Sequence, residues 1–136
     1  MKSRESLIRL KRFQVDERRR QVADIQMMIS EFERMAGDLD QQIVAEQERS
    51  GIADVKHFAY PTFAKAAIQR RDNLLASAAD LRVKLERASD ELAEAYEDLK
   101  RVELIEEREV ERERVAGAMR EQASLDEVAL VMHRQG

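Results

Sequence analysis

The sequence contains no cysteine and no tryptophan, and it has little proline, glycine or aromatic residue. Without cysteine the chain can form neither a disulfide nor a thiolate metal site, which fits a reducing compartment. One proline, four glycines and 4% aromatic residues leave too few turn formers and too few large apolar side chains for a sandwich or an α/β domain. With 38% charged residues, the composition is instead typical of long helices or a coiled coil.

Long apolar runs are also missing. No segment approaches the roughly 20 apolar residues of a membrane span, and the start MKSRESLIRLKRF lacks the apolar run of a signal peptide. We therefore expect a soluble, cytoplasmic chain. The net charge of −4 predicts no nucleic-acid partner. The RRR run at 18–20 is similar to the basic segment of a basic-zipper DNA binder. Here, however, apolar residues at seven-residue spacing, Ile8 and Val15, continue through the basic segment.

What the sequence does contain is a seven-residue repeat of apolar positions. The repeat begins at Ile8, and a second series follows each position by three residues. The same pattern returns between Ala67 and Val102. A seven-residue repeat keeps one stripe facing a partner helix, so it predicts a coiled coil. The predicted seam consists of Ile8, Val15, Val22, Ile25, Ile29, Phe32, Leu39, Ile43, Leu74, Leu81, Leu85, Leu92, Leu99 and Val102.

Two such segments joined by a turn predict an all-α fold, a long antiparallel two-helix coiled-coil hairpin within a single domain, residues 1–136. We expect the first arm over about 3–50, the turn over 51–61 and the second arm over 62–123. Beyond Val102 the seam positions become glutamates, so the second stripe fades. Ser124 and Glu127 have capping-box spacing. Either a short C-terminal helix occupies 124–134, or the second arm simply continues.

Charge supports antiparallel pairing of the arms. Residues 1–20 carry eight basic and three acidic side chains, whereas residues 86–127 carry seven basic and fifteen acidic ones. Folding the chain about residue 56 lays the basic start against the acidic stretch, and we expect Lys11 to lie within a turn of Glu106. The last residues of the second arm then extend past the start of the first. Their apolar side chains favour a partner over a frayed tail.

The stretch GIADVKHFAYPTF at 51–63 holds the only proline and three of the six aromatic residues. Gly51 suits a left-handed helix C-cap, and Pro61 suits the first turn of the second arm. These residues therefore mark the place where the chain reverses. Phe58 and Phe63 could plug the end of the seam or contact a partner, and the sequence leaves both open.

No pattern in the sequence points to catalysis. It has no phosphate-binding glycine loop, no nucleophile with its base, and no neighbours at ligand spacing around His57 or His133. We expect no catalytic residue, no metal and no cofactor. The heptads also fit a generic coiled-coil adaptor or chaperone, including one that forms a homodimer.

Three stretches carry a family resemblance. LIRLKRFQVDERRRQVADIQ at the start, HFAYPTFAKAAIQRRDNLL after the turn and the late EREVERER together resemble the flagellar FliJ family. The resemblance implies a stalk-like coiled coil that inserts into the export ATPase ring, promotes its assembly and activity, and contacts the export gate and export chaperones. It also implies a cytoplasmic protein that is membrane-associated only through the export apparatus. The stalk of virulence type III secretion is the analogous alternative.

The resemblance suggests two contact surfaces. The ring is contacted at the end where the termini meet. Our candidates there are chosen by charge and exposed apolar character: Arg4, Arg9, Lys11, Arg12, Arg18, Val115, Met119, Arg120 and Leu125. The gate is contacted away from that end, and the candidates are Phe58, Tyr60, Phe63 and Arg70.

Overall fold

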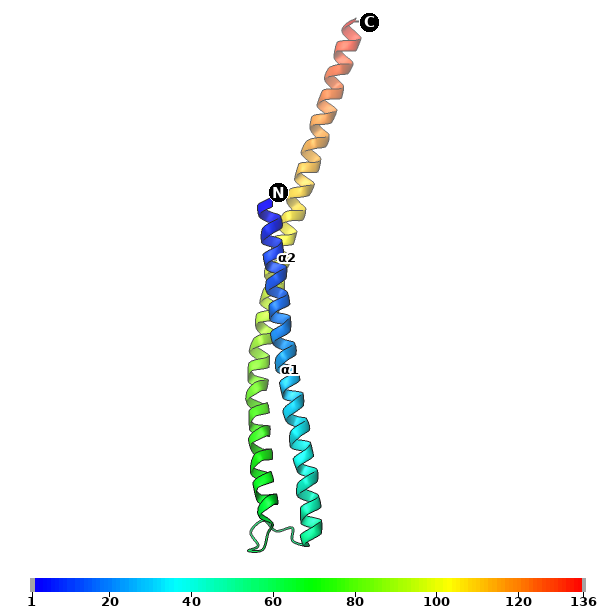
Figure 1. The fold of residues 1–136 in the computed structure, drawn as a ribbon. Coiled ribbons are helices and arrows are strands. Elements are labelled where there is room, and N and C mark those ends of the chain that lie inside the picture. The colour runs from blue at the N-terminus through cyan, green and yellow to red at the C-terminus, as the bar shows by residue number, and fades with distance from the viewer. Residues whose placement is uncertain (1, 136) are drawn as a thin grey trace. The chain divides into compact units, whose positions relative to one another are not determined.

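The chain forms two long α-helices joined by an irregular turn. The computed structural model describes residues 2–135, except for the side chain of Lys2. Helix α1 spans Lys2–Ser50, helix α2 spans Thr62–Gln135, and no strand occurs among the described residues (Figure 1). The predicted all-α fold, with two long helices packed against each other, is confirmed.

Contacts within the chain define two compact units. Unit 1 contains Met1–Gln14 and Ala95–Gly136, and unit 2 contains Val15–Glu94 with the turn. Each unit therefore takes one segment from each helix.

The core of unit 2 combines large side chains of α1 with alanines of α2. Val15, Ile29, Ala36 and Ile43 are the buried apolar residues of α1 in this unit. The buried residues of α2 are Ala64, Ala67, Ala78, Leu81 and Ala88. Small residues facing large ones let two helices interdigitate at close range. None of the predicted seam residues in either unit is exposed: all fourteen are buried or half-buried.

Ion pairs along unit 2 join the two helices in antiparallel order. Arg18 Nη1 lies 2.6 Å from Glu91 Oε2. Farther towards the turn, Glu33 pairs with Arg82, and the Asp40 and Arg71 side chains are 2.8 Å apart. All three pairs are centred within a few residues of position 56, where the sequence predicts the reversal. Exposed pairs of this kind stabilise by only about 0–1 kcal/mol each, so they select the register more than they hold the helices together.

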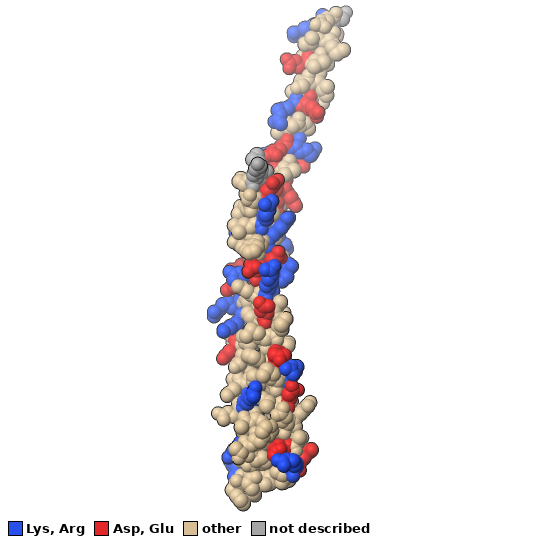
Figure 2. Space-filling view, viewed as in Figure 1, with Lys and Arg blue, Asp and Glu red and all other residues tan. Residues whose placement is uncertain are grey.

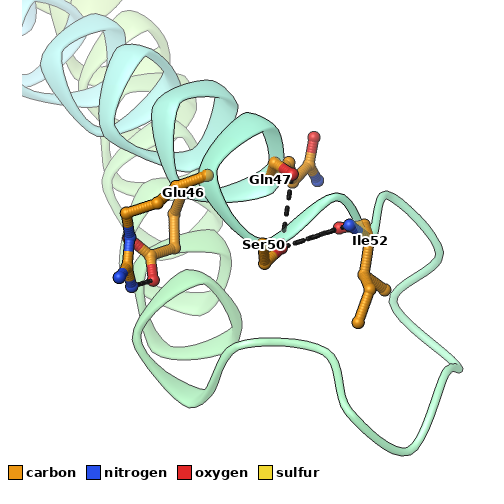
Figure 3. A network of polar contacts seen from close by, with 5 residues as sticks. Glu46, Gln47, Ser50 and Ile52 are labelled. Atoms are coloured by element: carbon orange, nitrogen blue, oxygen red, sulfur yellow. Dashed lines mark hydrogen bonds and ion pairs between the residues drawn. The ribbon is translucent and has the colours of Figure 1, made fainter.

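The turn begins at a glycine in the left-handed conformation. Gly51 has φ 72°, and its N–H donates to the carbonyl of Gln47 at 2.9 Å. The Ser50 hydroxyl donates to the same carbonyl at 3.2 Å and accepts from the Ile52 N–H at 3.2 Å (Figure 3). These bonds satisfy groups that the end of α1 leaves without helical partners. Pro61 stands just before α2, where its carbonyl accepts from the Lys65 N–H at 3.1 Å.

Helix α2 passes through Ser124 and Glu127 without a break. Of the two alternatives that the sequence left open, the structure has the continuing helix, and no separate helix forms over 124–134. The residues ahead of Ser124, AMREQA, are mostly strong helix formers and include no glycine or proline. Ser124 therefore occupies a helical position, whereas a capping residue must adopt non-helical backbone angles.

Two glycines in different backbone conformations allow a matched test of the turn. We expect Gly51→Ala to lower the unfolding free energy by about 1–2 kcal/mol, because an added Cβ is strained at positive φ. Gly37→Ala should instead raise it by up to about 1 kcal/mol, because Gly37 lies inside α1 and nothing lies within 4 Å of an added Cβ. Urea unfolding followed by circular dichroism measures both. Equal effects of the two substitutions would contradict the C-cap.

Candidate interaction surfaces

Arg4 of α1 contacts three glutamates of α2 in unit 1. Its Nε lies 2.7 Å from Glu106 Oε2, while its two terminal nitrogens lie 3.8 Å from Glu109 Oε2 and 3.6 Å from Glu113 Oε1. The Nε and the Glu106 oxygen are shielded from solvent but are not aligned as a hydrogen bond. The attraction is therefore mainly Coulombic, and shielding strengthens it. This Arg4 cluster stands where the apolar seam of α2 has ended.

The predicted partner of Lys11 is wrong. Lys11 Nζ lies 4.0 Å from Asp98 Oδ2, and Glu106 is held by Arg4 instead. Arg4 stands one heptad before Lys11 in the same seam series. A chain folded about residue 56 places Glu106 closer to the level of Arg4 than to that of Lys11. The seam positions of both helices are charged here. Glu106 pairs with Arg4, which stands one heptad before the expected Lys11.

The five basic residues predicted for the ring-contact surface divide into two groups. Arg4, Lys11 and Arg18 are engaged with carboxylates of α2, so they are not available as a free basic surface. Arg9 and Arg12 are exposed, although Arg12 Nη2 lies 3.4 Å from Glu103 Oε2. The structure therefore reduces the basic half of this surface to Arg9 and Arg12.

The remaining ring-contact candidates lie on the part of α2 that follows the Arg4 cluster. Val115, Met119 and Leu125 are exposed, as is Arg120. Every residue from 118 to 135 is exposed. In this part of α2 charged residues of both signs alternate with uncharged ones (Figure 2). The apolar side chains here have no cover within the part of the chain that the structure describes.

The aromatic residues of the turn occupy opposite environments. Tyr60 is only 6% exposed, and its hydroxyl oxygen accepts a hydrogen bond from Gln47 Nε2 at 2.9 Å. Phe58 is 96% exposed and stacks on the His57 ring at 4.7 Å between centroids. Phe63 and Arg70 are exposed.

These environments correct two interpretations. Tyr60 is not available for a gate contact, because it closes the seam together with Ala64, which is fully buried. Phe58 and Phe63 do not plug the seam. The heptad held the missed signal: Tyr60 stands seven residues before Ala67, and Ala64 stands seven before Arg71, whereas Phe58 and Phe63 fall outside both series.

Other charged groups form local pairs along the helix surfaces. Hydrogen bonds from Arg34, Arg49 and Arg114, together with their charges, lower the pKa values of Glu31, Glu46 and Glu111 below the usual carboxyl range. Each pair is three residues apart on one helix. Hydrogen bonds to Asp40 and Asp72 raise the pKa of Arg71. The run at 18–20 is paired in the same way, with Arg19 beside Asp16 at 3.7 Å and Arg20 beside Glu17 at 2.8 Å.

The side chains of residues 2–135 meet the requirements of neither a metal site nor a membrane span. Within this range no group of three or more His, Cys, Asp or Glu side chains could hold a metal ion. Neither described helix contains a stretch that is long and apolar enough to cross a bilayer.

A surface that the sequence prediction missed lies on α2 in unit 1. A shallow groove there is lined by residues of one side of the helix, including Leu104, Arg108, Glu111 and Val115. Each of these stands two residues, about half a turn, from a position that faces α1. They therefore lie on the side of α2 that points away from α1. We call this surface the outer face of α2, comprising Leu104, Glu107, Arg108, Glu111, Val115 and Met119.

Comparison with known proteins gives one result. The family described as "Flagellar FliJ protein" matches residues 1–136, the full length of the chain. No curated protein and no solved structure matches the chain. The family match includes the turn as well as both helices, so it does not depend on heptad repeats alone.

The Arg4 cluster gives a ranked stability prediction. We expect Arg4→Glu to lower the unfolding free energy by roughly 1–3 kcal/mol, because it places a fourth carboxylate beside the half-buried Glu106 and Glu109 and the exposed Glu113. Lys11→Glu should cost less, because Lys11 has one pair at 4.0 Å. The exposed control Glu48→Lys should change little. Thermal unfolding monitors all three, and adding Glu106→Arg to Arg4→Glu should recover part of the loss. Equal losses for Arg4→Glu and Glu48→Lys would contradict the cluster's role.

Proposed function

The chain belongs to the FliJ family and is therefore a component of the flagellar export apparatus, and we propose that it acts there as a stalk within the export ATPase ring. In this role it promotes assembly of the ring and ATP hydrolysis. It also links the ring to the export gate and to export chaperones. The family is non-catalytic, so the chain acts on the ATPase by binding.

The observation that carries the proposal is the uncovered part of α2. Among the described residues, Glu113 is the last of α2 that an ion pair joins to α1, and the helix continues from there to Gln135. Most helix stability in proteins comes from packing an apolar face, and this part of α2 has no packed face among the described residues. Val115, Met119 and Leu125 provide apolar groups that nothing in the described chain covers. A ring of ATPase subunits would supply the missing cover.

Charge at the start of α1 adds a second point of support. Arg9 and Arg12 are exposed in unit 1, whereas Arg4 and Lys11 of the same unit are engaged with carboxylates of α2. Exposed charges at the rim of an interface mainly speed association and fix orientation. We therefore assign Arg9 and Arg12 to the rim of the ring contact and the apolar residues of α2 to its centre.

The turn is the proposed gate contact. Phe58 is an almost fully exposed aromatic residue on a turn held by hydrogen bonds from Gly51, Lys56 and Ala59. Aromatic anchors on a pre-organised surface are common centres of binding energy. Phe63 and Arg70 extend this surface along the first turns of α2. The chaperone contact rests on the family resemblance alone.

Removing the uncovered part of α2 tests the ring contact. We expect a chain ending at Arg114 to keep the folding of its helical pair but to lose most of its stimulation of a flagellar export ATPase. Replacing both Arg9 and Arg12 with Glu should weaken the stimulation several-fold. The effect should be largest at low ionic strength, where charge guides association. Arg34→Glu, an exposed arginine in unit 2, is the matched control. Undiminished stimulation by the shortened chain would overturn the assignment.

The turn can be tested because Phe58 and Tyr60 differ so strongly in burial. Phe58→Ser should weaken binding to the gate's cytoplasmic domain about ten-fold, within the range of a typical hot spot, while leaving the melting temperature unchanged. Tyr60→Ser should lower the melting temperature, because it removes a buried ring and the bond from Gln47. Calorimetric binding and thermal unfolding separate the two effects. Gate binding that is indifferent to Phe58→Ser would remove the turn from the contact.

A further inference from the structure

We propose that the outer face of α2 binds the same face of a second copy of this chain in antiparallel orientation. The face is exposed in unit 1 and points away from α1, so a second helix could reach it without displacing α1. Its sequence identifies the occupant, because the spacing of its residues is the same from either end and its opposite charges exchange places on reversal.

The central stripe of the face shows this symmetry. Leu104, Arg108, Glu111 and Val115 are separated by four, three and four residues. Reversing the direction leaves the spacing unchanged, exchanges the two apolar ends, and exchanges arginine for glutamate in the middle. An antiparallel copy therefore sets Leu104 against Val115 of the second copy and Arg108 against Glu111 of the second copy. A two-fold axis repeats both contacts, as an isologous dimer requires.

A parallel copy in register would instead place Arg108 on Arg108 and Glu111 on Glu111. The charges thus favour one orientation and oppose the other.

The charged residues of the face are free to make these contacts. Glu107 and Arg108 form no ion pair with any described residue. Glu111 is paired with Arg114 on its own helix, at 2.7 Å, with both side chains at least 60% exposed. Such a solvated local pair contributes little, so its members can turn to a second copy at small cost.

The contact is short, and this sets its strength. It spans only about three turns of helix, so it falls in the range of small, transient interfaces. We therefore expect a reversible dimer whose population rises with protein concentration. The paired form covers Val115 and Met119, which the proposed ring contact also uses. The dimer and the ring-bound chain would therefore exclude each other. The self-pairing itself does not depend on the proposed stalk role.

A charge-swap series on the full chain tests the proposal. Sedimentation equilibrium of the unaltered chain should show a monomer–dimer equilibrium. Arg108→Glu should raise the dimer dissociation constant roughly ten-fold or more, because it sets carboxylates against each other twice. Glu111→Arg should do the same. Combining both substitutions restores opposite charges in each pair and should restore association. The matched control exchanges Glu17 and Arg20, a local ion pair on α1 in unit 2, and should leave association unchanged.

Orientation is tested by cross-linking, which the absence of native cysteine makes clean. A Leu104→Cys chain mixed with a Val115→Cys chain should form the mixed disulfide faster than either chain forms a disulfide with itself. Faster self-cross-linking of each variant would mean parallel pairing and would overturn the proposal. A chain that stays monomeric at every concentration would overturn it too, as would single and double charge variants that associate equally. None of these measurements involves the ATPase, so they fail or succeed independently of the stalk role.

Discussion

The packing of a seven-residue apolar stripe against alanines is the interaction on which the rest of the structure depends. In unit 2 the buried side chains of α1 meet a surface of α2 made almost entirely of alanine. Alanine has the highest helix propensity and the smallest apolar side chain, so it favours the helix and permits close approach at once. A chain with 38% charged residues can fold this way because a narrow seam needs so few apolar positions. The remaining faces are left for ion pairs and for partners.

Charge takes over where the apolar seam ends. Beyond Val102 the seam positions of α2 carry Glu106, Glu109 and Glu113, and Arg4 reaches all three. This arrangement supplements the half-buried Ile8 in holding the start of α1. It also leaves α2 free to continue beyond α1 with its apolar residues uncovered. The change from apolar to glutamate seam positions thus marks the end of the pairing between α1 and α2. It also marks the start of the exposed part of α2 to which we assign partners.

The heptad was sufficient to predict the fold, because a repeat of seven specifies both the helix and the side that packs. The position of Tyr60 and Ala64 was readable from the same repeat but was missed, since the proline and the aromatic cluster were interpreted as turn residues. The predicted partner of Glu106 was wrong by one heptad, since Arg4 pairs with it instead of Lys11. Several acidic residues lie within a turn of each basic one, so charge alone does not specify a pair. The outer face of α2 was missed because it departs from the seam series and mixes charged with apolar residues.

The difference between the two units has a consequence for how the chain responds to its solution. Unit 2 is held by apolar burial, which excluded salts such as sulfate strengthen. Unit 1 has half-buried apolar residues and adds the Arg4 cluster, in which the shielded contact to Glu106 resists screening but the longer contacts to Glu109 and Glu113 do not. Rising sulfate would therefore strengthen the apolar packing while weakening the two longer contacts of Arg4. The two ends of the helical pair differ in this response to salt.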